Sequence, residues 1–207
     1  ALVIAIIDYG MGNLFSLKSS FSYIGEDVTV TDDKNVIHAA HKLILPGVGA
    51  FGDAAKKLRD SGLTEVIQKE TSSGKPLLGI CLGMQMLLEK SYEYGEHEGL
   101  GLIPGNVTPI EPDIPKGYKI PHIGWNALHF PTDRPKNPLF QDIEEGEFVY
   151  FVHSYHGTNC ADSIIATTEY GGTLTAAVAR ENVFGTQFHP EKSGEVGLRI
   201  LRTFSRL

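Results

Sequence analysis

The sequence predicts an α/β fold in which a mostly parallel central sheet is covered by helices on both faces. Two observations lead to this class. Short apolar runs alternate with amphipathic helical stretches over the first half of the chain, a pattern typical of parallel strands joined by crossover helices. In the second half helices become sparse and strand-like runs follow one another, so some of these strands are expected to be antiparallel. A chain of 207 residues suits a single domain spanning residues 1–207.

The first half contains four expected strands, and the apolar run at residues 2–8 begins the sheet. A helix is expected next, at residues 13–24, because Leu14, Leu17, Phe21 and Ile24 recur on one helical face and Gly25 provides a stop. The remaining strands of this half are expected at residues 27–31, 42–45 and 77–80. Helices are expected at residues 50–60, 63–71 and 84–90.

The second half is expected to extend and close the sheet. Its strands are expected at residues 107–110, 126–130, 147–152, 164–169, 175–180 and 183–188. A final helix at residues 194–206 carries Val196, Ile200, Leu201 and Phe204 on its apolar face. The segments 91–105 and 111–121 are expected to be irregular connections.

Composition limits the partners and the setting of the protein. The formal net charge is −7, which argues against nucleic acid or an anionic membrane as a partner. Cys81 and Cys160 are the only cysteines, too few for a secreted disulfide scaffold, so a reducing cytoplasmic setting is expected. The apolar run at residues 2–7 is too short for a signal peptide or a membrane span.

The segment Gly79-Ile80-Cys81-Leu82-Gly83 lies between an apolar strand and a helical stretch. Gly-x-Cys-x-Gly at such a junction is typical of a nucleophile elbow, the sharp turn that raises one reactive side chain at the edge of a sheet. The turn crowds its neighbours, so glycine on both sides is a steric requirement. The positive end of the following helix favours the thiolate form of such a cysteine. A small buried cysteine without chemistry is the alternative for this segment taken alone.

A second segment, GTQFHPEK at residues 185–192, favours the catalytic interpretation. It ends an expected strand with His189, Pro190 and Glu191. An imidazole can take a proton from a thiol and return it to a leaving amine. A carboxylate two residues further on can hold the other ring nitrogen and so fix the tautomer. Cys81, His189 and Glu191 therefore supply the three roles of a catalytic triad.

With both segments placed, the chain resembles the class I (triad) glutamine amidotransferases, which have a three-layer, flavodoxin-like fold. Four further segments narrow the resemblance to the glutaminase subunits of imidazole glycerol phosphate synthases. These are DYGMGNL at residues 8–14, PGVGAFG at 46–52, PHIGWN at 121–126 and YFVHSY at 150–155. PHIGWN is treated as specific to these subunits, whereas the cysteine and histidine segments are shared by the whole class.

The resemblance implies a reaction and a partner. The Cys81 thiolate attacks the side-chain amide of glutamine, His189 protonates the departing ammonia, and water releases glutamate from the thioester. Ammonia passes to a separate synthase (cyclase) subunit with a (β/α)8 barrel, as a heterodimer. That subunit makes imidazole glycerol phosphate and an aminoimidazole carboxamide ribonucleotide in histidine biosynthesis. No cofactor or metal is expected, and His153 and His156 lack the acidic or cysteine neighbours of a metal site.

The resemblance also assigns residues to the site. The backbone N–H groups of Leu82 and of Val48 and Gly49 are expected to stabilise the oxyanion. Residues expected to bind the substrate glutamine are Gly49, Gln85, Glu93, His153, Ser154 and Tyr155. Residues expected at the interface with the synthase are Met11, Asn13, Trp125, Asn126 and Tyr150.

Three other functions remain open from the sequence. The chain could be a stand-alone cysteine hydrolase of the same fold, which Gln85 and the PHIGWN segment argue against. It could be the glutaminase subunit of another synthase. It could be a binding subunit without catalysis, which the presence of Cys81, His189 and Glu191 argues against.

Overall fold

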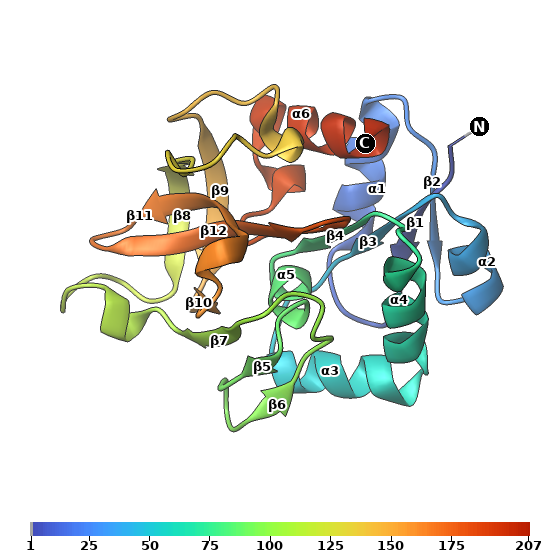
Figure 1. Ribbon diagram of the computed structural model, residues 1–207, viewed down its shortest axis with the longest axis horizontal. Coiled ribbons are helices and arrows are strands. Elements are labelled where there is room, and N and C mark those ends of the chain that lie inside the picture. The colour runs from blue at the N-terminus through green and yellow to red at the C-terminus, as the bar shows by residue number, and fades with distance from the viewer. Residues whose placement is uncertain (1) are drawn as a thin grey trace.

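A seven-stranded sheet forms the centre of the fold in the computed structural model, which describes residues 2–207 (Figure 1). Its strand order is β11-β12-β13-β4-β3-β1-β2. The strands are β1 (Ile4–Ile7), β2 (Val28–Thr31), β3 (Lys42–Leu45), β4 (Leu77–Ile80), β11 (Ile164–Glu169), β12 (Thr173–Arg180) and β13 (Val183–Thr186). The run from β13 to β2 is parallel, whereas β12 and β11 are antiparallel. The predicted fold class is therefore confirmed. Ala1, where the expected domain begins, lies outside the described residues.

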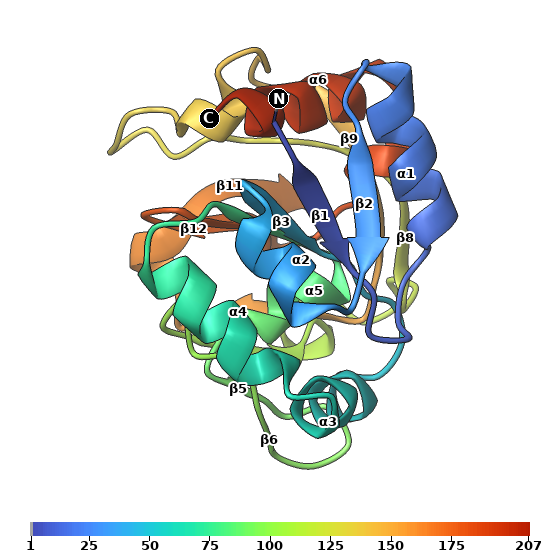
Figure 2. The same ribbon diagram turned by 90° about the vertical axis from the view of Figure 1, so that its right-hand side faces the viewer.

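Helices cover both faces of this sheet (Figure 2). The helices α1 (Leu14–Tyr23) and α6 (Gly194–Arg206) lie on one face, and α2 (Lys34–Ala39), α3 (Phe51–Asp60), α4 (Leu63–Ser72) and α5 (Leu82–Met86) lie on the other. Side chains of β1 alternate between two apolar clusters: Ile4 and Ile6 pack with the first group, and Ala5 and Ile7 pack with the second. Because both faces are buried, the central strands β1 and β4 are apolar without interruption.

Three helix boundaries follow from local chemistry. Asn13 caps α1, its Oδ1 accepting from the Ser16 N–H at 3.2 Å. The chain leaves α1 through Gly25, whose φ of +81° is accessible to glycine. The helix α2 was not predicted, although Asp33 caps it by accepting hydrogen bonds from two backbone N–H groups. It has six residues, too few for a periodic pattern to be evident.

Two smaller sheets complete the second half. One has the order β10-β7-β5-β6, formed by β5 (Lys90–Ser91), β6 (His97–Glu98), β7 (Asn106–Pro109) and β10 (Tyr155–Thr158). The other is the antiparallel β8–β9 ribbon, formed by β8 (His122–Ala127) and β9 (Phe148–His153). Short 3-10 helices span Glu111–Asp113, Pro138–Phe140, Ala161–Ser163 and Pro190–Lys192.

Three sequence-based expectations for this region were wrong. The strand expected at 126–130 begins earlier, because residues from His122 to Ala127 pair with β9 despite the glycine at position 124. The helix expected at 84–90 ends at Met86, because Lys90 and Ser91 pair with β7. The segment 91–105 was expected to be irregular but contains β6. In the first two cases a partner strand further along the chain determines the local structure, whereas β6 pairs with the neighbouring β5.

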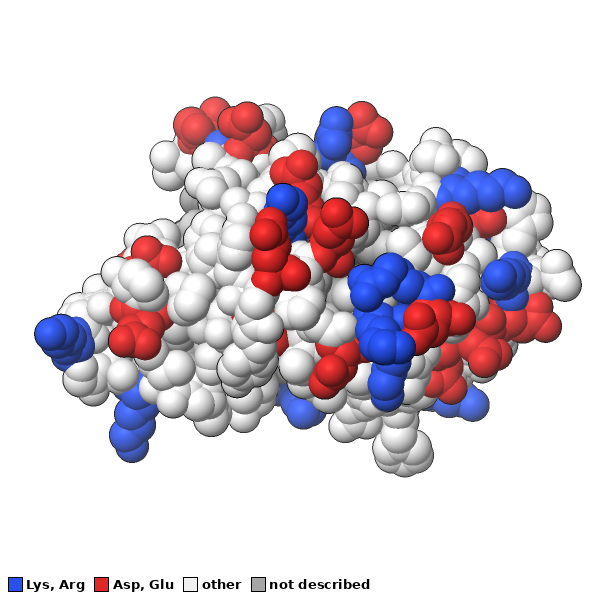
Figure 3. Space-filling view, turned by 90° about the horizontal axis from the view of Figure 1, so that it is seen from below, with Lys and Arg blue, Asp and Glu red and all other residues white. Residues whose placement is uncertain are grey.

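The charged side chains form no continuous field of one sign on the face shown in Figure 3, where acidic and basic groups are interspersed. Within residues 2–207, no helix has the length and apolar character needed to cross a membrane.

Candidate active site

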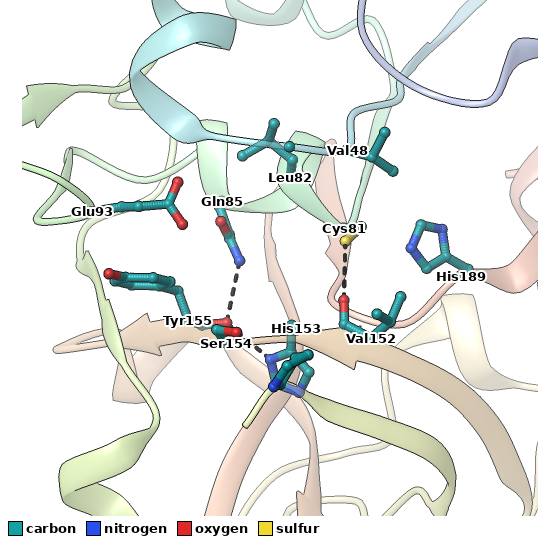
Figure 4. Close-up of a pocket in the computed structure, with 12 residues that line it drawn as sticks. Val48, Cys81, Leu82, Gln85, Glu93, Val152, His153, Ser154, Tyr155 and His189 are labelled. Atoms are coloured by element: carbon teal, nitrogen blue, oxygen red, sulfur yellow. Dashed lines mark hydrogen bonds between the residues drawn. The ribbon is translucent and has the colours of Figure 1, made fainter. Parts of the chain in front are cut away.

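Three neighbouring parallel strands, β3, β4 and β13, end at the same edge of the central sheet. The residues that follow them are the glycine-rich segment 46–49, Cys81 and the segment leading to His189. Ligand sites in open α/β sheets lie at the carboxyl ends of the strands. A cavity of about 370 Å³ opens there (Figure 4). It is lined by Val48, Gly49, Cys81, Leu82, Gln85, Glu93, Pro121, Val152, His153, Ser154, Tyr155 and His189.

The turn at Cys81 has the geometry of a nucleophile elbow. Cys81 adopts φ +55° and ψ −111° immediately before α5, a conformation that costs free energy for a residue with a Cβ. Its neighbours leave no room for side chains: a Cβ at Gly83 would lie 1.9 Å from the Leu45 carbonyl oxygen, and one at Gly79 would lie 2.6 Å from that of Gly83. The two glycines of the motif are therefore required sterically, as predicted.

His189 and Glu191 form a buried pair beside Cys81. The Nδ1 atom of His189 lies 3.3 Å from the carboxylate of Glu191, and each side chain is 3% exposed. The Nε2 atom of His189 has no hydrogen-bond partner among the described residues. Burial opposes the charged imidazole, but the Cys81 thiolate and the Glu191 carboxylate outweigh it and raise the pKa of His189 to about 10. The arrangement favours the protonated form of His189.

The backbone around His189 is held by the β8–β9 ribbon. The His189 N–H donates to the Tyr150 carbonyl at 3.1 Å. Ser193 completes the contact, since its Oγ accepts from the Tyr150 N–H at 3.0 Å and donates to the His189 carbonyl at 2.6 Å. Ser193 is buried, and its position after the His-Pro-Glu sequence was the signal available for this role.

The expected oxyanion donors line the cavity, but one is occupied. The Leu82 N–H donates to the Gly47 carbonyl at 3.2 Å, so this N–H does not point freely into the cavity. The same segment is also fixed by Tyr9, whose hydroxyl donates to the Pro46 carbonyl at 2.7 Å. Burial raises the pKa of Tyr9 and keeps its hydroxyl protonated. The Leu82 N–H is therefore engaged by a backbone carbonyl of a segment that is itself held in place.

The expected substrate residues all reach the cavity. Figure 4 shows His189 on one side of the Cys81 sulfur and Gln85, Tyr155 and Glu93 on the other. Glu93 has a structural contact as well, because its Oε1 accepts from the Phe51 N–H at the start of α3 at 2.7 Å. Its carboxylate is therefore fixed at the rim.

His153 continues into a buried imidazole pair. Its Nδ1 donates to the Tyr155 carbonyl at 2.9 Å, and its Nε2 lies 2.9 Å from Nδ1 of His122. On the far side, Nε2 of His122 donates to Oδ1 of Asn126 at 2.9 Å. Burial lowers the pKa of His153 to about 3 and also lowers that of His122. Each neutral ring has one N–H group, and these two groups donate to the Tyr155 carbonyl and to Asn126. The contact between Nε2 of His153 and Nδ1 of His122 is therefore left without a proton.

The five expected interface residues belong to two regions of the surface. Trp125 is 52% exposed, and its ring lies 6.0 Å from that of Tyr150 on the β8–β9 ribbon. Asn126 is on the same ribbon. Met11 and Asn13 belong to the loop before α1, and the Met11 methyl group packs close to Gly49.

Residues 2–207 contain no group of three or more His, Cys, Asp or Glu side chains placed to hold a metal ion. His156, considered with His153 as a candidate ligand, instead lies 2.8 Å from Asp113 through its Nε2.

Four residues at the site were not indicated by the sequence. Pro121 and Val152 line the cavity, His122 supports His153, and Gln187 contacts the Cys81 sulfur. Each lies in a motif segment, but only the folded chain shows which of its side chains turn toward Cys81.

Comparison with known proteins agrees with this geometry. The family model described as class-I glutamine amidotransferase matches residues 5–206. Subunit HisH of imidazole glycerol phosphate synthase from Caldanaerobacter subterraneus is 50% identical, covering 99% of this chain and 98% of that protein. The HisH subunit of Methanothermobacter thermautotrophicus is also 50% identical, covering 98% and 97%. Among solved structures, PurLQS from Thermotoga maritima superposes with a TM-score of 0.76 at 21% identity, covering 99% of this chain and 98% of that one, a likeness of fold.

The elbow makes a prediction for stability. Alanine at position 83 is expected to destabilise the protein by at least about 3 kcal/mol or to prevent folding, because its Cβ overlaps the Leu45 carbonyl. The matched control is Gly25→Ala, where φ is +81° but the space is open. This control should cost only the strain of about 1 kcal/mol. Urea unfolding of both variants measures the difference, and equal losses would contradict the steric argument.

The buried imidazole makes a prediction for pH. The unfolded chain binds a proton at His153 below pH 6.5, whereas the folded protein does so only near pH 3. Between these values acid favours the unfolded state, so stability falls as the pH drops, by about 1.4 kcal/mol per pH unit for this group. His153→Asn should flatten the slope by that amount in urea unfolding between pH 6.5 and 4.5. An unchanged slope would show that the ring is not held neutral.

Proposed function

Since the chain belongs to the class-I glutamine amidotransferases, and among them to the HisH subunits of imidazole glycerol phosphate synthase, we propose that its cavity hydrolyses glutamine through a thioester on Cys81. The observation that carries this proposal is the convergence of an elbow cysteine, a buried His–Glu pair and a cavity at one edge of the sheet. The products are glutamate and ammonia.

Each member of the triad has a separate role in the reaction. The Cys81 thiolate attacks the amide carbon of glutamine, and His189 Nε2, which has no other partner, gives its proton to the leaving ammonia. Glu191 holds Nδ1 and keeps the ring oriented. His189 then takes a proton from the water that hydrolyses the thioester. Gln85, Glu93 and the segment 153–155 surround the remainder of the substrate.

The contacts of Leu82 support a resting state for this reaction. The developing oxyanion needs N–H donors, but the Leu82 N–H is engaged by the Gly47 carbonyl. Val48 lies between two glycines, and Gly49 has a φ of +102°, so peptides of this segment can reorient without a side-chain barrier. Loss of one oxyanion donor costs about a hundred- to a thousandfold in turnover. Reorientation of residues 47–49 would therefore switch the enzyme on.

The partner that favours this reorientation is a cyclase subunit with a (β/α)8 barrel, in a cytoplasmic heterodimer with lyase activity in histidine biosynthesis. Ammonia released at Cys81 passes to that subunit. Two surfaces support the location of the interface: the β8–β9 ribbon with exposed Trp125, and the loop 8–13, whose Met11 packs on Gly49. Contacts with either surface reach the site, since Tyr150 binds the His189 backbone.

The nucleophile is tested by Cys81→Ala in the complex. Glutamine-dependent synthesis should be abolished, whereas synthesis from added ammonium should persist because that chemistry belongs to the partner. Cys160→Ala is the matched control, since Cys160 is the other buried free cysteine and lies outside the cavity. Glutamine-dependent turnover by the Cys81→Ala complex would exclude the proposed function.

The division of roles predicts unequal losses at His189 and Glu191. His189→Ala should remove the proton carrier, whereas Glu191→Gln should lower turnover less, because the ring keeps its position. Glu191→Gln should also lower the pKa of His189, since it removes one of the charges that raise it. The alkaline limb of the pH–rate profile should then move to lower pH. Equal losses at saturating glutamine and an unmoved alkaline limb would contradict these roles.

The resting geometry predicts that the isolated chain is a poor glutaminase. Turnover should rise by about a hundredfold or more when the synthase subunit and its nucleotide ligand are both added. The measurement compares the chain alone, with partner, and with partner plus ligand. Full activity of the chain alone would favour a stand-alone cysteine hydrolase.

A further inference from the structure

We propose that Gln187 is a positioning residue whose side-chain amide donates a hydrogen bond to the Cys81 sulfur and favours its thiolate. The inference rests on the proposed function, since it assigns a role in preparing that nucleophile. Gln187 belongs to the segment after β13 and is fully buried. Its Nε2 lies 3.8 Å from the Cys81 Sγ, within the range of a hydrogen bond to sulfur.

The orientation of the Gln187 amide is fixed by its other contact. Its Oε1 lies 3.1 Å from Nε2 of Gln85, which also lies 3.2 Å from the Tyr155 carbonyl. A backbone carbonyl only accepts, so Gln85 must present its NH2 group to Tyr155. The same NH2 group has a second hydrogen, which Gln187 Oε1 accepts. The NH2 group of Gln187 is consequently the part that faces the sulfur.

The Tyr155 carbonyl, on which this orientation depends, is itself held in place. It accepts a second hydrogen bond from Nδ1 of His153 at 2.9 Å, and the His153 ring is packed against His122 in the buried pair. The chain of contacts extends to Asn126, whose Nδ2 donates to the Glu169 carbonyl at 3.0 Å. The orientation of the N–H group that faces the sulfur is therefore fixed by hydrogen bonds that extend beyond the cavity lining.

A second contact of the Cys81 sulfur favours the thiol form over the thiolate. The Cys81 sulfur lies 3.9 Å from the Val152 carbonyl, which can accept from a thiol but repels a thiolate. Gln187 opposes this preference because an N–H group stabilises the negative sulfur. A hydrogen bond to a charged group is stronger than one between neutral groups, so removing this donor should measurably reduce the thiolate fraction.

The test is the pH dependence of Cys81 alkylation by iodoacetamide in the full chain, followed by mass mapping of the peptide that contains Cys81. Gln187→Met keeps the length of the side chain but lacks the donor. We expect its alkylation midpoint to move to higher pH by about one unit. Gln187→Glu, which presents only acceptors when ionised, should move the midpoint in the same direction. Gln68→Met is the matched control, because Gln68 donates to the Leu100 carbonyl away from the cavity, and its midpoint should stay in place.

Turnover of the complex supplies the second measurement. Gln187→Met should lower kcat for glutamine hydrolysis at neutral pH and restore part of it at higher pH, while KM for glutamine changes little. Alkylation midpoints that coincide in the original chain and in both Gln187 variants would overturn the role of Gln187, even if Cys81→Ala abolishes turnover. Retained turnover in Cys81→Ala would instead overturn the proposed function and leave the alkylation result standing.

Discussion

The close approach of Gly83 to the end of β3 is the constraint on which the site depends. With no Cβ at position 83, the first turn of α5 packs directly against the Leu45 carbonyl. This contact forces the chain to turn sharply between β4 and α5, and Cys81 takes up the turn in a left-handed conformation. The strain is stored where the side chain has to project. The same contact places the segment after β3 beside the N-terminus of α5.

The electrostatics of the site follow from this packing. Burial alone would discharge His189, yet a thiolate on one side and a carboxylate on the other keep it protonated. The side chains of His189 and Glu191 are both buried, so each charge depends on its neighbour for stabilisation. In a second set of imidazoles, His122 and His153, burial dominates and lowers the pKa of both rings, which favours their neutral forms. Two histidine environments of opposite character therefore lie beside the same cavity.

The β8–β9 ribbon connects the outside of the protein to these charges. One of its faces carries exposed Trp125, whereas its backbone holds His189 through Tyr150 and Ser193. The loop 8–13 has a comparable position, since Tyr9 binds the Pro46 carbonyl and Met11 lies against Gly49. Both surfaces contact either the segment 46–49 or the backbone of His189 directly, as coupling to a partner would require.

The sequence by itself determined the alternating strands and helices of the first half, the elbow, and most of the residues that line the cavity. These follow from local rules: apolar periodicity, glycines at crowded positions, and a motif in which Cys81 and His189 follow adjacent strands. Tertiary structure decided the rest. Lys90 and Ser91 became a strand because β7 lies beside them, and Gly47 occupies the Leu82 N–H because two strand ends meet. The orientation of Gln187 depends on Tyr155, distant in the chain. Hydrogen-bond partners distant in sequence leave no periodic signal, so only the folded chain specifies them.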